Sequence, residues 1–349
     1  MSAATTGLPS AHIARRSAAA GRLKAAAAGQ SYAAPAAVLL VVLLILIALR
    51  GPSMFTERGL TIAASVAAPL VLATMALTPV AIAGRGGIDL SIGPLMGFVN
   101  VTIVVWLIGN GVRNPVPVIA FALALALAVG FINGVLVAVV RLQPIIAALG
   151  GYLVLSGLAT YVLPSASGSV PSWLSGMAGK TGSVPTAALI LLGAFIVWTW
   201  VSRTALFRNI RMLGGDERAA YASTVAIRPA HIAAYCIAGL FAGLAALMLT
   251  AVIASGNASQ GPTYTLTSVA ALALGGVSLA GGRGGMLGAV LGALDIYCLN
   301  YVLDTFNFGV NAANVTQMFY GLVLVVALAI SGATRLLLAR RHLRAGEAR

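Results

Sequence analysis

The sequence predicts an all-α fold: a polytopic integral membrane helical bundle of about ten transmembrane helices, with the N- and C-termini on the cytoplasmic side. The first observation is the composition, because 60% of the 349 residues are hydrophobic and only 8% are charged, against roughly 25% charged residues in soluble domains. The second is the length of the uncharged apolar runs. The third is the distribution of Lys and Arg, which gather at the ends of these runs.

The apolar runs predict ten membrane spans, because about 20 apolar residues cross the hydrocarbon core of a bilayer. The spans are expected near residues 33–49, 60–83, 91–108, 117–140, 144–163, 185–201, 229–253, 264–280, 285–303 and 313–332. Pro69, Pro79, Pro94 and Gly130 interrupt some of the runs. One or two segments are therefore candidates for a re-entrant path.

The orientation follows from Lys and Arg near the span ends. With the N-terminus inside, 17 of the 21 basic residues fall on the cytoplasmic side. The four on the outside are Arg50, Arg58, Arg113 and Lys180. An even number of spans then places both termini in the cytoplasm. Trp198, near the end of a span, is expected at the membrane interface, where aromatic residues are enriched.

The chain divides into one membrane domain and two basic tails. Residues 1–32 are rich in Ala, Ser and basic residues, and we expect a disordered cytoplasmic tail. A cleaved transit peptide has a similar composition, but residues 33–49 follow directly, without an A-x-A cleavage pattern, and are expected to form an uncleaved first span. The membrane domain covers 33–332, and 333–349 form the second basic tail.

The composition also excludes other classes of protein. A net charge of +14 is typical of nucleic-acid-binding domains, but these basic residues flank apolar runs and do not cover one face with interleaved aromatic residues. Cys236 and Cys298 lie inside apolar runs without ligand spacing, so we expect two small hydrophobic residues and no disulfide or metal site. No catalytic constellation has plausible spacing, and we expect no enzyme activity in this chain.

The segment 203–228 is charged and lies between two long apolar runs. Gly214 and Gly215 are expected to end the preceding structure, and Asp216 is a good N-cap. Glu217 suits the positive N-terminal end of a helix, and the small residues that follow can enter a groove on another protein. The segment therefore predicts a short cytoplasmic helix, with an ordinary solvated loop as the alternative.

Two glycine-rich breaks separate predicted spans. Gly84–Gly93 reads GRGGIDLSIG, and Gly275–Gly285 reads GGVSLAGGRGG. Glycine permits turns and close helix approach, while Asp89, Ser91 and Ser278 can bind backbone groups that a break leaves unpaired. A phosphate-binding loop is disfavoured, because no strand precedes either break and neither ends in G-K-[ST].

Four motifs together resemble the permease subunits of ribose-type monosaccharide ABC importers. They are GGIDLSIG, Asn133-Gly134 leading into VLVAVVRLQPIIAALG, GGDERAA and GGVSLAGGRGG, in this order within about 55–332. The resemblance implies a helical permease of the bacterial inner membrane that pairs with a second permease subunit as a homo- or heterodimer. It also implies a periplasmic solute-binding protein and a cytoplasmic ATP-binding subunit, so that ATP and Mg bind the partner and no cofactor binds this chain.

The resemblance assigns coupling to the ATPase to the segment around GGDERAA. The expected coupling residues are Asp216, Glu217, Arg218, Ala219, Ala220 and Ser223. The chain departs from the family at Thr224, where glycine is usual. It also departs at 263–270, where two threonines replace carboxylates. This leaves open whether the substrate is a pentose, another monosaccharide, a polyol or a related small polar molecule.

Polar residues at membrane depth are the candidates for the translocation path or its gate. They are Asp89, Ser91, Asn133, Asp295, Asn300 and Gln317. An unpaired Asp295 in an apolar helix would cost about 2.5–3.5 kcal/mol on insertion scales, so it should face a cavity, a partner or a subunit interface. Interhelical hydrogen bonding is the alternative role for the amides. Asp89 suits a structural turn or a gate better than a ligand site.

Two functional classes follow. The first is the permease subunit of an ABC importer, which moves a monosaccharide or similar small polar solute and depends on ATP hydrolysis by a separate chain. The second is a self-sufficient secondary transporter or channel, in which Asp295 serves an ion or proton pathway.

Overall fold

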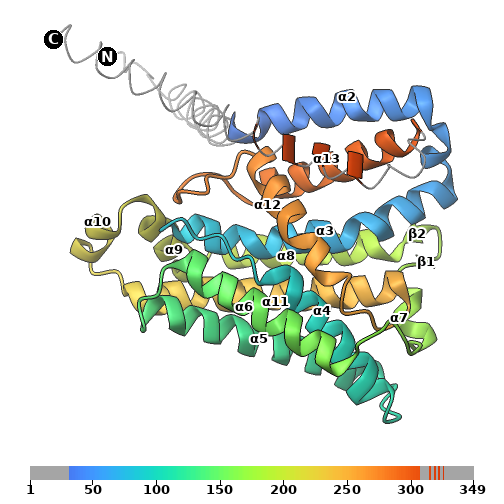
Figure 1. Cartoon of the computed structure of the whole chain (residues 1–349). Coiled ribbons are helices and arrows are strands. Elements are labelled where there is room, and N and C mark those ends of the chain that lie inside the picture. Colours follow the sequence, from blue (N-terminus) through green and yellow to red (C-terminus); the bar gives the residue numbers. More distant parts are fainter. Residues whose placement is uncertain (1–30, 307–313, 316–317, 320, 323–324, 326–349) are drawn as a thin grey trace, which may run out of the picture.

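The chain folds into a bundle of long helices in the computed structural model (Figure 1). The structure describes residues 31–306 together with 314–315, 318–319, 321–322 and 325. The two basic tails lie almost wholly outside this part. The predicted tenth span, 313–332, lies mostly outside it as well.

Each of the first nine predicted spans overlaps a described helix. The long and medium helices are α2 (Ala34–Arg50), α3 (Glu57–Ala83), α4 (Ile92–Thr102, continued as a π-helix over Ile103–Ile108), α5 (Pro115–Ala138), α6 (Pro144–Val162), α8 (Thr186–Ser202), α9 (Ala205–Gly215), α11 (Ile227–Ile253), α12 (Tyr264–Leu274) and α13 (Met286–Asp304). The short elements are α7 (Ser172–Gly176), α10 (Glu217–Ala222), the strands β1 (Lys180–Thr181) and β2 (Val184–Pro185), and 3-10 turns at Ser31–Ala33, Pro52–Phe55 and Gly261–Thr263.

Five of the described helices are long and apolar enough to cross a membrane by length and composition. They are α3, α5, α6, α11 and α13. The pair α8 and α9 adds a sixth if it counts as one span, although the two helices meet at a bend of 77°. Helices α2 and α4 are apolar but shorter. The described part of the chain is therefore a helical membrane protein whose only strands form one small hairpin.

Helices α3 and α11 form the centre of the bundle. In the most apolar 18-residue stretch of each helix, 78% of the residues are buried in α3 and 67% in α11. The corresponding share is 22% in α5 and in α6. Glycine allows α5 and α11 to pack closely, since a Cβ on Gly239 would lie 2.4 Å from the Ala126 carbonyl oxygen. Small residues at the contact are a usual basis of helix association in membranes.

The structure differs from the sequence prediction in three places. Segment 203–228 contains two helices, α9 and α10, because an amphipathic stretch precedes Gly214. Helix α12 ends at Leu274, since the glycine break starts at the next residue. Trp198 is buried inside the bundle and does not lie on its outer surface, since its ring packs edge-on against Phe207, with centroids 4.8 Å apart.

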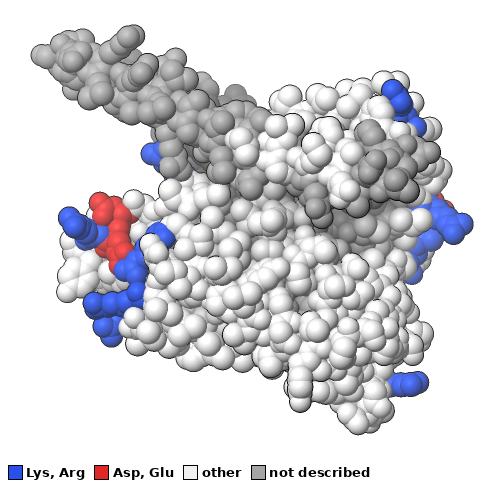
Figure 2. Space-filling model, in the orientation of Figure 1, with Lys and Arg blue, Asp and Glu red and all other residues white. Residues whose placement is uncertain are grey.

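Charged side chains gather at the two ends of the bundle (Figure 2). Acidic and basic side chains lie together at the end that carries α10. Basic residues also mark the opposite end, where α7 and the hairpin lie (Figures 1 and 2). On the face that Figure 2 shows, the described surface between the two ends is almost free of charged side chains, as expected for the part of a helical bundle that faces lipid.

Candidate functional site

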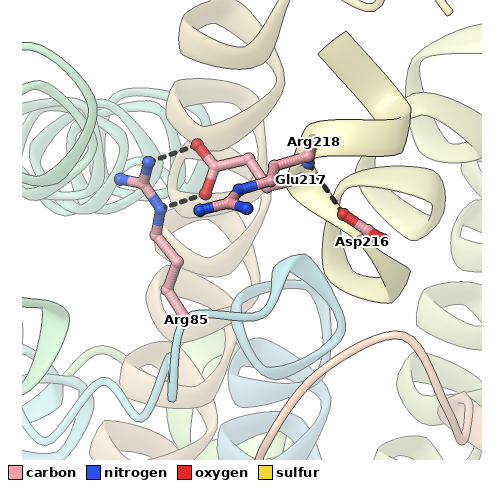
Figure 3. A network of polar contacts seen from close by, with 4 residues as sticks. All are labelled: Arg85, Asp216, Glu217 and Arg218. Carbon is pink, nitrogen blue, oxygen red and sulfur yellow. Dashed lines mark hydrogen bonds and ion pairs between the residues drawn. The ribbon is translucent and has the colours of Figure 1, made fainter. Parts of the chain in front are cut away.

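Helix α10 begins with a well-formed N-cap. One carboxylate oxygen of Asp216 accepts hydrogen bonds from the backbone N–H groups of Arg218 at 2.8 Å and Ala219 at 3.2 Å (Figure 3). Asp216 has extended backbone angles and separates α9 from α10. The predicted cap is therefore confirmed, because a capping side chain satisfies N–H groups that the first turn leaves unpaired.

An ion pair joins α10 to the first glycine break. Arg85 donates from Nε to Oε2 of Glu217 at 2.7 Å, and its Nη2 contacts the other carboxylate oxygen (Figure 3). These hydrogen bonds from Arg85 lower the pKa of Glu217. Both side chains are about one third exposed, so the pair contributes about 1 kcal/mol or less to stability. Its bidentate geometry fixes the position of one segment relative to the other.

Three glycine segments from distant parts of the chain meet beside this ion pair. A Cβ on Gly214 would lie 1.7 Å from the Ile82 carbonyl oxygen, and one on Gly281 would lie 2.5 Å from the Cα of Gly84. The N–H of Gly282 also donates to the Ile82 carbonyl at 3.1 Å. The two glycine breaks and the end of α9 therefore pack backbone against backbone. We call this contact the glycine junction.

Three predicted path residues form one chain of hydrogen bonds. Asp89 accepts from the N–H of Ser91 at 2.9 Å and from its hydroxyl at 2.6 Å. The amide of Asn133 on α5 then donates to the Ser91 hydroxyl oxygen at 2.9 Å. All three residues are buried. This polar chain gives Asp89 the turn role expected of it and connects the first glycine break to α5.

Two hollows lie beside α10, and Glu217 and Tyr221 line both of them. Ala219 and Tyr221 are exposed, Tyr221 to 74%, whereas Ala220 is only 1% exposed and packs inward. One hollow, of about 520 Å³, lies between α10 and the ends of α5 and α11, where Arg141 is among its lining residues. The other opens beside Arg218. The exposed face of α10 therefore offers a shaped surface, to which Ala220 contributes only packing.

The remaining predicted path residues lie elsewhere. Asp295 and Asn300 are on α13, and among the described residues no hydrogen bond of Asp295 or of the Asn300 side-chain oxygen joins them to the polar chain. Asp295 is fully buried, and neither carboxylate oxygen has a hydrogen-bond partner among the described residues. The side-chain oxygen Oδ1 of Asn300 is also buried and has no hydrogen-bond partner among the described residues. Gln317 lies outside the described residues.

The described residues offer no constellation for a metal ion. No group of three or more His, Cys, Asp or Glu side chains comes together among them. Cys298 is buried and Cys236 is half-buried, and both are free thiols.

Sequence reasoning missed two residues of this region. Arg85 counted only as a cytoplasmic charge, because its partner Glu217 is 132 positions away. Tyr221 carried no motif. The structure explains why glycine is usual at the position of Thr224. The φ of this residue is +62°, which lies in the left-handed region. Glycine adopts this region without strain, and a β-branched residue does not.

The fold and this site belong to a class of membrane permeases. Residues 59–328 match the family described as "Branched-chain amino acid transport system / permease component", and the chain belongs to this family.

Individual relatives are more specific. The ribose import permease protein of Escherichia coli strain K12 is 32% identical over 271 residues, covering 75% of this chain and 81% of that protein. A probable ABC transporter permease protein of the same strain is 29% identical over 270 residues, covering 75% and 77%. The galactose/methyl galactoside import permease protein of Haemophilus influenzae is 28% identical over 200 residues, covering 54% and 60%.

Proposed function

We propose that this chain is the membrane-spanning permease subunit of an ABC importer for a monosaccharide or a similar small polar solute. The observation that carries the proposal is a capped, partly exposed helix at a charged end of the bundle, joined by an ion pair to a glycine break. The names of the relatives support it, since two are sugar import permeases and one is a probable ABC transporter permease. These names also favour it over a self-sufficient secondary transporter.

The proposed topology has ten spans, with both termini and α10 in the cytoplasm of a bacterium and the bundle in its inner membrane. The asymmetry of Lys and Arg supports this orientation. The charged end with α10 is then the cytoplasmic end, and α7 with the β1–β2 hairpin lies at the periplasmic end.

The proposed partners follow from this topology. A cytoplasmic ATP-binding subunit contacts α10 and hydrolyses ATP with Mg, so this chain is not itself an enzyme. A periplasmic solute-binding protein delivers the solute to the opposite end. A second permease subunit, identical or related, completes the translocation path.

The proposed coupling route starts at α10. When the ATPase shifts α10, the ion pair with Glu217 moves Arg85. Arg85 belongs to the first glycine break, which also contains Asp89 and Ser91, so the whole break moves. The Ser91 hydroxyl is bonded to Asn133, so the displacement reaches α5. The glycine junction transmits the same motion to the second break, because its backbones touch without side chains between them. Asp295 and Asn300 are proposed to face the second subunit or the path.

The first prediction tests the docking face. Replacing Ala219→Glu introduces a bulky charge on the exposed side of α10, whereas Ala205→Glu places the same charge on an exposed alanine in the first turn of α9. Binding contacts at the centre of an interface tolerate such changes poorly. We expect the first variant to insert and fold but to lose ATPase stimulation and uptake by at least about tenfold.

The measurement is solute uptake and ATPase rate in liposomes that hold the complete complex. The Ala205→Glu variant should retain both activities. Uptake at the wild-type rate from the Ala219→Glu complex would remove the coupling role of α10.

A further inference from the structure

A third pocket lies at the end of the bundle opposite to α10. It has a volume of about 540 Å³ and lies between the C-terminal half of α6, the chain that follows it and the loop before α12. This volume is within the range of roughly 300–1,000 Å³ that is usual for small-molecule sites. None of the five predicted path residues that the structure describes lines it.

Hydroxyl groups line one side of this pocket. Tyr152, Ser156 and Thr160 are spaced four residues apart on α6, so they lie along one face of the helix. The Ser156 hydroxyl is buried and has no hydrogen-bond partner among the described residues. A buried hydroxyl without a partner loses its hydrogen bonds to water. A ligand hydroxyl can restore the missing bond.

The other side of the pocket is held by an amide network. Asn257 and Ser259 line it from the loop before α12. Buried Asn100 on α4 accepts from the N–H of Asn257 at 2.8 Å and donates to the Ser255 carbonyl at 3.0 Å. Two backbone hydrogen bonds between Ser167 and Gly256 join the two loops. The lining groups are therefore held in place before any ligand arrives.

The described residues that line the pocket include no ionised side chain. Its members are Tyr152, Ser156, Thr160, Leu163, Pro164, Ala166, Asn257, Ala258, Ser259 and Pro262. Hydroxyl and amide groups without Asp, Glu, Lys or Arg suit a neutral ligand that both donates and accepts hydrogen bonds. Tyr152 adds a ring on which an apolar C–H face can pack.

The same helix reaches the polar chain. Gly151, next to Tyr152, lies against Ser91 and Asn133. A Cβ on Gly151 would be 3.1 Å from the Ser91 Cβ and 3.5 Å from the side-chain oxygen Oδ1 of Asn133. Helix α6 therefore runs from the pocket to the residues that connect to α10. This continuity is what a site on the transport route requires.

We propose that this pocket is the outer solute site of the permease, and that it takes a neutral polyhydroxy compound, a monosaccharide or a polyol, through hydrogen bonds to Ser156, Thr160 and Asn257. The inference rests on the proposed function. It adds the position of the site, the absence of charge on the ligand and the residues that bind it.

One arm of the test measures which side of the membrane the pocket faces. Thr160→Cys, in a Cys236→Ala, Cys298→Ala background, is treated in intact spheroplasts with a membrane-impermeant maleimide. We expect labelling without permeabilisation, whereas Tyr221→Cys on α10 should react only after permeabilisation. Labelling of Thr160→Cys only from the inside would overturn the orientation, and the proposed function with it.

The other arm measures uptake by the complete complex of radiolabelled ribose, galactose and xylitol, with ribose 5-phosphate as the anionic comparison. Ser156→Ala together with Thr160→Val removes two hydroxyls at little change in volume, and we expect uptake of the preferred neutral solute to fall about tenfold. Ser156→Phe fills the pocket and should abolish uptake. Leu153→Phe, on an exposed flank of the same helix outside the pocket, is the matched control and should transport normally.

The outcomes separate the two proposals. Outside labelling of Thr160→Cys with normal uptake by the Ser156→Ala, Thr160→Val and Ser156→Phe variants would overturn the solute site and leave the permease function intact. A wild-type complex that takes up none of the three neutral solutes, or that takes up ribose 5-phosphate equally well, would contradict the proposed ligand class.

Discussion

At the scale of single residues, Thr224 carries backbone strain just after the helix that is proposed to meet the ATPase. Its φ of +62° costs a β-branched residue about 1–2 kcal/mol relative to glycine. We expect Thr224→Gly to stabilise the permease by about 1 kcal/mol, because glycine relieves this strain but gains freedom in the unfolded chain. Thermal unfolding in detergent measures the difference.

Ser223→Gly is the matched control for this substitution. Ser223 has an ordinary φ of −89°, so glycine brings only the entropic cost and should lower the melting temperature. A lower melting temperature for Thr224→Gly than for wild type would show that the left-handed conformation is wrong.

The ion pair between Arg85 and Glu217 has a predictable dependence on pH. Arg85 lowers the pKa of Glu217 below its ordinary value of 4.5, so the contribution of the pair is complete above that value and is lost as the pH falls through the lowered pKa. Between pH 5 and 8 the stability difference between wild type and Glu217→Gln should therefore be constant, at about 1 kcal/mol or less.

Transport should respond to this pair more than stability does. We expect Arg85→Glu and Glu217→Arg to uncouple ATPase from uptake when made singly, and the double exchange to restore coupling in part, since it rebuilds an ion pair of opposite polarity. Uptake assays on the complete complex measure this. If both single variants take up solute at the wild-type rate, the proposed route from α10 to the first glycine break is wrong.

At the scale of elements, two adjacent glycines allow a sharp comparison at the end of α9. A Cβ on Gly214 would meet the backbone of Ile82 at 1.7 Å, whereas a Cβ on Gly215 would meet no atom within 4 Å. Close packing cannot absorb the first contact without moving the backbone. We expect Gly214→Ala to destabilise the permease by about 2 kcal/mol or more and Gly215→Ala to be tolerated.

Expression level, thermal unfolding and uptake of the two variants check this prediction. Equal behaviour of Gly214→Ala and Gly215→Ala would mean that the glycine junction does not form as described.

Local features of these elements could be predicted from the sequence. The apolar runs mark the helices because hydropathy is read over a single segment, and Gly215-Asp216-Glu217 marks the start of α10 because capping involves neighbouring residues. The bend between α8 and α9 could not be predicted in this way. The sequence separates an apolar run that ends near residue 201 from a charged segment that begins at 203. The angle of 77° between the two helices is not a local property of either segment.

At the scale of the whole molecule, the candidate sites consist of contacts between distant segments. Arg85 reaches Glu217 across 132 positions, and the outer pocket joins α6 to a loop about 100 residues later. Composition and spacing carry no information about such pairs. Asp89, Ser91 and Asn133 could be proposed together from their motifs, but their hydrogen bonds required the fold. Asp295 stands out in the sequence as a charge inside an apolar run, and it lies on a different helix, α13.

A continuous series of contacts connects the two ends of the bundle. The proposed solute pocket is connected through α6 to the polar chain, and the polar chain is connected through the first glycine break to α10. The central claim is that a separate ATP-binding subunit grips α10, because every later step depends on movement of that helix.

Site-specific crosslinking tests this claim most directly. A photoreactive phenylalanine at position 221, where the native Tyr221 side chain is 74% exposed, would be activated in native membranes and the product identified by mass spectrometry. The account predicts a crosslink to a cytoplasmic ATP-binding subunit, with a yield that changes when ATP is added, and none from the same probe at position 153. A crosslink only to lipid or to a periplasmic protein would contradict it.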